Sequence, residues 1–342
     1  MPPPSAPAPL LPIAISLGDP AGIGPELIAA AWAVRDAEGL PPFFAVGNRA
    51  LVEAAAHSRG LAFPVVAISA PDEAAAVFPH ALPVLDVGAC PYTPGQPDDA
   101  GAALALRALE IATALVRQGA AAALVTGPIA KSRLAHIGFR QPGQTEFVAE
   151  ACGITAENAV MMLAGPNLRV VPITVHVALR DVPFLLSAEL IRSRSAIAAA
   201  ALTRDFGVAH PRLAIAALNP HAGEDGRMGT EDSAVIAPAV AALREAGIDA
   251  RGPLPADTMF HAEARATYDA AICMYHDQAL IPIKVLDFDE GVNVTLGLPI
   301  VRTSPDHGTA FGIAGKGIAR PGATIAAIRM AGQCAARRAA AG

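Results

Sequence analysis

Short apolar runs bounded by glycine, proline or aspartate recur along most of the chain. Runs of this kind are typical of strands that are buried on both faces of a sheet. They cover residues 13–17, 42–46, 64–68, 121–125, 170–175, 212–217 and 270–274. Segments with helical spacing lie among them at 100–118, 187–203 and 233–246. Strand and helix in alternation predict an α/β fold with a largely parallel sheet.

The chain has 342 residues, which is enough for two lobes with separate cores. It has no internal repeat and no long linker, so we expect interleaved lobes in which the first and last segments share one lobe. The predicted division is a loose leader over 1–12, a first α/β lobe over 13–135 with 300–342, and a second over 136–299. Ligands bind beyond the carboxyl ends of parallel strands, so the polar residues after each strand are the candidates for function.

Composition excludes several classes of protein. No stretch reaches the ~18 consecutive apolar residues of a membrane-spanning helix, and no Lys or Arg precedes the apolar residues of the leader, as a secretory signal would require. The net charge of −6, without a basic run, argues against a nucleic-acid partner. The cysteines are far apart with no Cys-x-x-Cys pair, which argues against disulfides. We expect a cytoplasmic protein with no membrane or nucleic-acid partner.

Three polar turns adjoin predicted strands or helices. Segment 17–26 (LGDPAGIGPE) could bring backbone close to a ligand, but Leu27 stands where the dinucleotide fingerprint has its third glycine, so a structural turn is an equal alternative. Segment 125–132 could hold an anion at free helix amides near Lys131, or form only a capped helix. Segment 142–147 (PGQTEF) is typical of a helix start.

Three histidines, His176, His221 and His276, each lie directly or closely after a predicted strand. At one edge of the sheet they could bind a divalent ion and leave positions open for a substrate. Their separations match no local metal-binding motif, and each one alone would be an ordinary hydrogen-bonded histidine. Together they form a candidate metal site.

Two stretches near the end of the chain are candidates for binding anions. Lys284, Asn293 and Arg302 could form a cradle for a phosphate or carboxylate, because guanidinium offers paired donors and ammonium a point charge. Segment 306–322 places glycines around Lys316, so its backbone amides could meet a nucleotide. The alternatives are solvated surface charges and a flexible surface loop.

A series of strings resembles one known family. In chain order they are GDPAGIGPE, TGPIAK, TEF, NPHAGE, GTED, PADTMF, YHDQALIPIK, GVNVTLGLPIVRTSPDHGTA and AGKGIA. In combination they are similar to the 4-hydroxythreonine-4-phosphate dehydrogenase family of vitamin B6 biosynthesis. The resemblance runs from about residue 13 to about residue 330, and its most specific part extends from YHDQ to HGTA.

This resemblance implies a homodimer of two-lobed α/β/α subunits of the isocitrate and isopropylmalate dehydrogenase type, with the active site in the interlobe cleft at the dimer interface. It implies oxidation of 4-hydroxythreonine 4-phosphate by NAD or NADP with one divalent metal (zinc, magnesium or cobalt). The resulting 3-oxo acid decarboxylates to 3-amino-2-oxopropyl phosphate, a step of pyridoxal phosphate biosynthesis.

The resemblance also assigns roles to residues. The metal ligands are His176, His221 and His276, one of them from the partner subunit. The substrate-binding residues are Gln144, Thr145, Lys284, Asn293 and Arg302. The catalytic residues are Asp257, Asp277 and Lys284. The cofactor-binding residues are Asp306, His307, Gly308, Gly315 and Gly317.

Two positions depart from the family pattern. Gln144 stands where the family usually has histidine; an amide can donate to a phosphate but cannot carry charge or relay a proton. Phe311-Gly312 stands where the family usually has Leu-Asp, which affects the expected details of cofactor binding.

Other functions remain open at this point. Sister dehydrogenases that act on threonate or erythronate 4-phosphate, or on an aromatic dihydrodiol carboxylate, share the same metal and cofactor chemistry. A metal-dependent hydrolase or acyltransferase would use the histidines without a nicotinamide. A binding protein without catalysis would need only the anion cradle.

Overall fold

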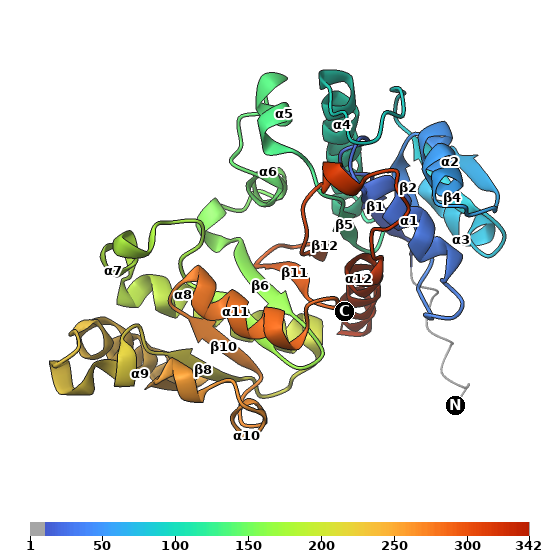
Figure 1. Ribbon diagram of the computed structural model, residues 1–342. Coiled ribbons are helices and arrows are strands. Elements are labelled where there is room, and N and C mark those ends of the chain that lie inside the picture. Colours follow the sequence, from blue (N-terminus) through green and yellow to red (C-terminus); the bar gives the residue numbers. More distant parts are fainter. Residues whose placement is uncertain (1–10, 342) are drawn as a thin grey trace, which may run out of the picture. The chain divides into compact units, whose positions relative to one another are not determined.

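The computed structural model describes residues 11–341, which divide into two compact units (Figure 1). Unit 1 consists of Met1–Arg140 with His307–Gly342, and unit 2 of Gln141–Asp306. Most of the expected leader lies outside the described residues, and the first strand begins at Ile13. None of the helices within residues 11–341 has the length and apolar content that crossing a membrane requires.

Unit 1 is built on a parallel sheet. Its strands lie in the order β3 (Val65–Ile68), β4 (Leu82–Asp86), β2 (Phe43–Gly47), β1 (Ile13–Ser16) and β5 (Leu124–Thr126). Every residue of β1, β2 and β5 is buried, as continuous apolar runs predict for strands covered on both faces. The helices of this unit are α1 (Gly24–Ala33), α2 (Arg49–Ser58), α3 (Ala74–Val77), α4 (Asp99–Arg117), α5 (Lys131–His136) and α12 (Gly322–Ala341).

Two helices show how unit 1 is held together. Helix α4 begins where the Asp98 side chain accepts a 2.7 Å hydrogen bond from the amide of Gly101, which satisfies one of the first free amides. Helix α12, at the other end of the chain, packs against β1 and β5. Gly332 allows this approach, because a Cβ there would lie 2.7 Å from Pro41. The two ends of the chain thus share one core.

Unit 2 is built on a mixed sheet. Its strands lie in the order β12 (Arg302–Pro305), β11 (Val292–Leu296), β6 (Val160–Ala164), β7 (Arg169–Pro172), β10 (Ala270–Cys273), β8 (Arg212–Ala216) and β9 (Asp249–Leu254). Strands β7, β10, β8 and β9 pair in parallel, whereas β12, β11, β6 and β7 pair antiparallel. The helices are α6 (Gln144–Ala151), α7 (Val182–Leu185), α8 (Ala188–Phe206), α9 (Ala237–Glu245), α10 (Ala262–Arg265) and α11 (His276–Leu286).

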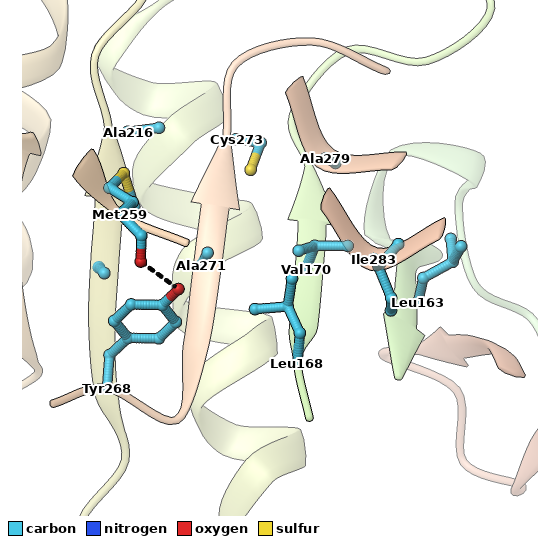
Figure 2. Packing of buried hydrophobic residues seen from close by; sticks show 11 residues of the cluster. Leu163, Leu168, Val170, Ala216, Met259, Tyr268, Ala271, Cys273, Ala279 and Ile283 are labelled. Carbon is cyan, nitrogen blue, oxygen red and sulfur yellow. Dashed lines mark hydrogen bonds between the residues drawn. The ribbon is translucent and has the colours of Figure 1, made fainter. Parts of the chain in front are cut away.

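The core of unit 2 includes apolar side chains from the parallel strands and from α11. Figure 2 shows Val170 of β7, Cys273 of β10 and Ile283 of α11 in one cluster of buried residues. Tyr268 fills the edge of this cluster and donates a 2.9 Å hydrogen bond from its hydroxyl to the carbonyl oxygen of Met259. The polar end of the ring is therefore satisfied inside the core.

The predicted α/β fold is confirmed, and each predicted strand and helix overlaps an observed one. The pattern missed the strands β4, β6, β9, β11 and β12. Strand β12 is Arg-Thr-Ser-Pro, so it has no apolar run, and β4 and β9 each contain a proline that argues against a strand. The antiparallel part of unit 2 consists largely of these missed strands.

One buried side chain connects two parallel strands of unit 2. Gln278 is only 8% exposed; its Oε1 accepts from the amide of Met274 at 2.6 Å, and its Nε2 donates to the carbonyl oxygen of Ala217 at 2.7 Å. Met274 and Ala217 directly follow β10 and β8. The Gln278 side chain therefore bridges the backbone of β10 and β8 just beyond the last residues at which the two strands pair.

We predict that Gln278→Leu lowers the free energy of unfolding by about 2–4 kcal/mol, because a buried amide and a buried carbonyl both lose their partner. Urea unfolding followed by circular dichroism measures the change. The exposed Gln333 of α12 provides the control, and Gln333→Leu should leave the midpoint nearly unchanged. Equal effects of the two substitutions would contradict the bridging role.

Candidate active site

The candidate residues of unit 2 follow strands that lie side by side. His176 follows β7, His276 begins α11 after β10, His221 lies in the turns of Pro220–Gly226 after β8, and Asp257 follows β9. These strands are parallel neighbours in the order β7-β10-β8-β9. Their carboxyl ends therefore meet at one edge of the sheet, where ligands of parallel sheets usually bind.

His176 and His276 face a common pocket. Their ring centroids are 5.7 Å apart, with the ring planes at 43°. The pocket has a volume of about 280 Å³. It is lined by Thr174, His176, Val177, Leu179, Val182, Tyr275, His276 and Asp277. Two imidazoles at this separation can contact one small ligand or ion.

Asp277 orients the imidazole of its neighbour. Nδ1 of His276 lies 2.7 Å from Oδ1 of Asp277. A carboxylate accepts and does not donate, so this contact favours the proton on Nδ1 and leaves the lone pair of Nε2 for a ligand. The pair therefore resembles the carboxylate–histidine arrangement that accompanies metal ligation.

The backbone at two of the candidate ligands is unusual. His176 has φ 54° and His221 has φ 51°, both in the left-handed region that residues with a side chain seldom adopt. Such conformations carry a cost of about 1–3 kcal/mol and persist where the surrounding structure holds them. Both histidines are thus held in place by their loops.

Acidic side chains anchor the loop that carries His221. Asp232 accepts hydrogen bonds from the amides of Leu218 and Asn219 at 2.7 and 3.2 Å, and Nδ2 of Asn219 donates to Glu231 at 2.8 Å and to Asp232 at 2.9 Å. Gly229 makes room, because a Cβ there would lie 2.5 Å from Nδ2 of Asn219. These acids had no predicted role, although GTED is among the strings that carry the family resemblance.

The arrangement fits a divalent metal only in part. Among the residues that the structure describes, no three His, Cys, Asp or Glu side chains lie together as metal ligands would. His176 and His276, with Asp277 bonded to one of them, could supply two ligands of such a site. His221 and Asp257 lie at the same edge of the sheet but do not line this pocket.

Arg302 of unit 2 has a buried guanidinium, and only 4% of the residue surface is exposed. Its guanidinium donates to the hydroxyl of Thr145 at 3.1 Å and to that of Thr295 at 2.8 Å. Burial lowers its pKa to about 10, an effect that the charge of Glu146 opposes. Even so the group is protonated at neutral pH, and the two neutral hydroxyls orient the charge without cancelling it.

Asn293 shares a sheet face with Arg302. It pairs with Ser304 across β11 and β12, and residues opposite one another or two apart along a strand lie on the same face. Gln144 is the first residue of α6, next to Thr145. Of the other four predicted substrate residues, Thr145 thus contacts the guanidinium, Asn293 shares its sheet face and Gln144 adjoins Thr145.

The fifth, Lys284, stands at the end of α11 and pairs with an acid. Its Nζ forms an ion pair with Oδ2 of Asp306 and donates to the carbonyl oxygen of the same residue at 3.2 Å. It also lies 5.3 Å from the ring centre of Phe288. Asp306 was predicted to bind the cofactor, but in unit 2 it contacts the lysine.

In unit 1, three glycine-containing segments that were predicted separately come together. The amide of Ile23 donates to the carbonyl oxygen of Thr309 at 3.0 Å, and that of Asp19 donates to the carbonyl oxygen of Pro128 at 2.8 Å. A Cβ on Gly22 would lie 2.9 Å from the Thr309 oxygen. The turn 17–26 is therefore a support for the segments 125–132 and 306–322.

The predicted cofactor loop is tightly packed at one glycine. Gly315 and Gly317 have φ 73° and 68°, and a Cβ on Gly315 would lie 2.7 Å from Pro94. Ala314 and Ala319 pack against Ile23 and Leu27 of the turn and of α1. His307 and Gly308 begin this loop, where Nδ1 of His307 lies 3.1 Å from the carbonyl oxygen of Gly308.

Glu26 is a buried carboxyl under this loop, with 1% of its surface exposed. Burial raises its pKa, while Arg59, 4.0 Å away, and the amide of Gly317 lower it. From the sequence it was predicted only as part of a turn. The sequence feature that could have indicated its burial is its place in the first turn of a largely apolar helix.

Comparisons with known proteins agree with these observations. The family model of the pyridoxal phosphate biosynthetic protein PdxA matches residues 40–331. The chain is 58% identical to the 4-hydroxythreonine-4-phosphate dehydrogenase of Erythrobacter litoralis over 97% of its own length and 98% of the relative's. A crystal structure of 4-hydroxythreonine-4-phosphate dehydrogenase from Klebsiella pneumoniae superimposes with a TM-score of 0.86 at 38% identity, covering 95% of this chain and 98% of that one.

A more distant similarity bears on one alternative function. The terephthalate 1,2-cis-dihydrodiol dehydrogenase structure from Burkholderia xenovorans has a TM-score of 0.63 and 28% identity, covering 95% of this chain and 98% of that one. Its TM-score and its sequence identity are both lower than those of the 4-hydroxythreonine-4-phosphate dehydrogenase structure from Klebsiella pneumoniae. The chain is therefore less similar to this dihydrodiol dehydrogenase than to the 4-hydroxythreonine-4-phosphate dehydrogenases.

The buried carboxyl of Glu26 predicts a pH effect on stability. Its pKa is higher in the folded protein than the 4.5 of the unfolded chain, so the folded state binds the proton more tightly. Its contribution to stability is therefore fully present below pH 4.5 and is lost as pH rises through the folded pKa. Relative to Glu26→Gln, the wild-type urea midpoint should fall as pH rises from 4.5 to 7. The exposed Glu110→Gln variant is the control, and an equal trend in it would contradict the assignment.

Proposed function

Since the chain belongs to the family of the pyridoxal phosphate biosynthetic protein PdxA, we propose that it oxidises 4-hydroxythreonine 4-phosphate with NAD or NADP in pyridoxal phosphate biosynthesis. The relatives that carry this name are oxidoreductases, and they match nearly the whole chain. The observation that supports the substrate best is the buried Arg302 with Thr145, in the same unit as the pair His176 and His276.

The substrate phosphate is bound by Arg302 and Lys284 of unit 2. Arg302 offers donors that the hydroxyls of Thr145 and Thr295 have already oriented, so little side-chain entropy is lost on binding. Asn293 and Gln144 add neutral donors, and Lys284 adds a point charge. These residues position the substrate and take no part in breaking bonds.

The imidazoles of His176 and His276 meet the reacting end of the substrate, together with His221. A divalent ion held by the three would act as a Lewis acid for the substrate hydroxyl and for the charge that develops during decarboxylation. Asp277 keeps Nε2 of His276 available as a ligand atom. Asp257 and Asp277 are the candidate proton acceptors for the hydroxyl, since each lies at the carboxyl edge of the strands.

The nicotinamide cofactor is bound by the loop that begins at His307. No heavy atom lies within 4 Å of the place where a Cβ on Gly308 would be, so its backbone amide is accessible to a phosphate-bearing ligand. Gly315 and Gly317 shape the same loop, where Gly315 packs against Pro94 and the amide of Gly317 faces Glu26. Phe311-Gly312 replaces the acidic residue usual in the family, so this loop offers no carboxylate at that position to the ribose. The cofactor would be NAD or NADP, and its nicotinamide would supply the acceptor for the hydride of the substrate.

A second copy of the chain would complete the metal site. His176 and His276 are neighbours within one chain, whereas no third ligand joins them among the described residues. Large apolar side chains near the pocket are exposed, with Leu179 at 66% and Phe184 at 88%, as are Ile281 at 62% and Val285 at 78% on the helix that carries His276. Apolar surface of this kind is typical of an association surface.

The function is tested by following NADH or NADPH formation with 4-hydroxythreonine 4-phosphate. We expect turnover that is lost on chelation and restored by zinc, cobalt or magnesium, with a preference over threonate 4-phosphate and erythronate 4-phosphate. Equal or better turnover of either analogue would contradict the proposed substrate. Release of a hydrolysed product with no reduced nucleotide would instead indicate a hydrolase.

The shared site is tested by mixing inactive variants. Neither the His221→Ala nor the His276→Ala variant should turn over the substrate by itself. When the two variants are mixed and their subunits reassort, half of the dimers contain one copy of each and have one complete site out of two. The mixture should therefore recover about a quarter of wild-type activity. A mixture of His176→Ala with His276→Ala should recover nothing, because these two imidazoles come from one chain. Failure of the first mixture would contradict a site shared between subunits.

A further inference from the structure

Asp306 holds the ammonium group of Lys284 through two different atoms. Its carboxylate oxygen Oδ2 forms the ion pair, and its carbonyl oxygen accepts the 3.2 Å hydrogen bond. The side chains of the two residues are 32% and 21% exposed, so the pair is partly shielded from water. An ion pair in this setting is stronger than one on the open surface.

This contact restricts a side chain that is otherwise very mobile. A lysine loses about 1.5–2 kcal/mol of rotamer entropy when it is fixed. The ammonium group donates one hydrogen bond to the carbonyl oxygen of Asp306 and forms an ion pair with Oδ2 of the same residue. The ring centre of Phe288 lies 5.3 Å from Nζ. The position of the ammonium group is therefore restricted before any ligand arrives.

The contact also connects two elements that carry substrate residues. Lys284 is on α11, the helix that begins with His276, and Asp306 directly follows β12, the strand that begins with Arg302. The pair thus fixes the distance between the end of α11 and the strand of the buried guanidinium.

We propose that Asp306 is a positioning residue of the substrate site, which acts through Lys284 and is not a ligand of the nicotinamide cofactor. The proposal rests on the proposed function, because it takes Lys284 as a substrate-binding residue. It replaces the expectation from the sequence that Asp306 belongs with the cofactor loop.

The first test separates the kinetic constants of the two substrates. In Asp306→Asn, kcat/KM for 4-hydroxythreonine 4-phosphate should fall about ten-fold, because the ammonium group loses its charged partner. The KM for the nicotinamide cofactor, and its dissociation constant measured by calorimetry, should stay within about two-fold. Asp306→Glu keeps the charge and should recover part of the loss.

A double-mutant cycle tests whether Asp306 acts through the lysine. Lys284→Met should lower kcat/KM by itself, and adding Asp306→Asn to it should cause less than about two-fold further change. Asp249→Asn is the matched control; this exposed residue lies at the amino end of β9 and carries the same charge. It should leave all constants unchanged.

The outcomes are distinguishable from failure of the proposed function. Wild-type protein that forms no reduced nucleotide with the substrate would contradict the function. Wild-type turnover together with an Asp306→Asn variant whose cofactor dissociation constant rises, while kcat/KM for the phosphorylated substrate is kept, would overturn the positioning role. Circular dichroism and urea unfolding of each variant show whether a loss of kcat/KM reflects misfolding. If Asp306→Asn is misfolded, the positioning role is judged from Asp306→Glu, in which kcat/KM should be partly kept and the cofactor dissociation constant unchanged.

Discussion

The parallel pairing of β7, β10 and β8 is the constraint on which the candidate site depends. Each strand ends at the same edge of the sheet, so the segments that carry His176, His276 and His221 begin as neighbours although they are far apart in sequence. Gln278 maintains this edge by bonding to backbone just beyond β10 and β8. Asp232 and Glu231 then hold the loop of His221. Ordinary hydrogen bonds thus hold the loop in which His221 has a left-handed backbone.

The two cations proposed to bind the substrate, Arg302 and Lys284, are held in different ways. Arg302 is buried and donates to two hydroxyls, which orient its guanidinium, and the charge of Glu146 acts on it from nearby. Lys284 is paired with a carboxylate, so its direction is fixed while part of its charge is balanced. A phosphate that meets both finds one strong, preorganised charge and one directed donor. The arrangement suits a small phosphorylated substrate that must be held in a single orientation.

The α/β fold and the strands that are buried on both faces could be predicted from the sequence, because short continuous apolar runs between turn residues are typical of such strands. Strand β12 could not, since it consists of Arg302, two hydroxyl residues and a proline, whereas β6 is itself an apolar run that the prediction omitted. The histidines were found because they follow strands, and their motifs placed the chain in its family. The ion pair of Lys284 with Asp306 was missed, because 22 residues separate the two and only the fold brings them together. Gln278 lies in a predicted motif, but its bridging role depends on the divergence of two strands.

The proposed chemistry depends on imidazoles that share one divalent ion, and locating that ion tests it most directly. Anomalous scattering from crystals grown with cobalt or zinc would show its position. We expect a peak within coordination distance of Nε2 of His276 and of the imidazole of His176, with His221 of a second copy as the third ligand. A metal bound elsewhere, or bound without His176 and His276, would contradict this chemistry.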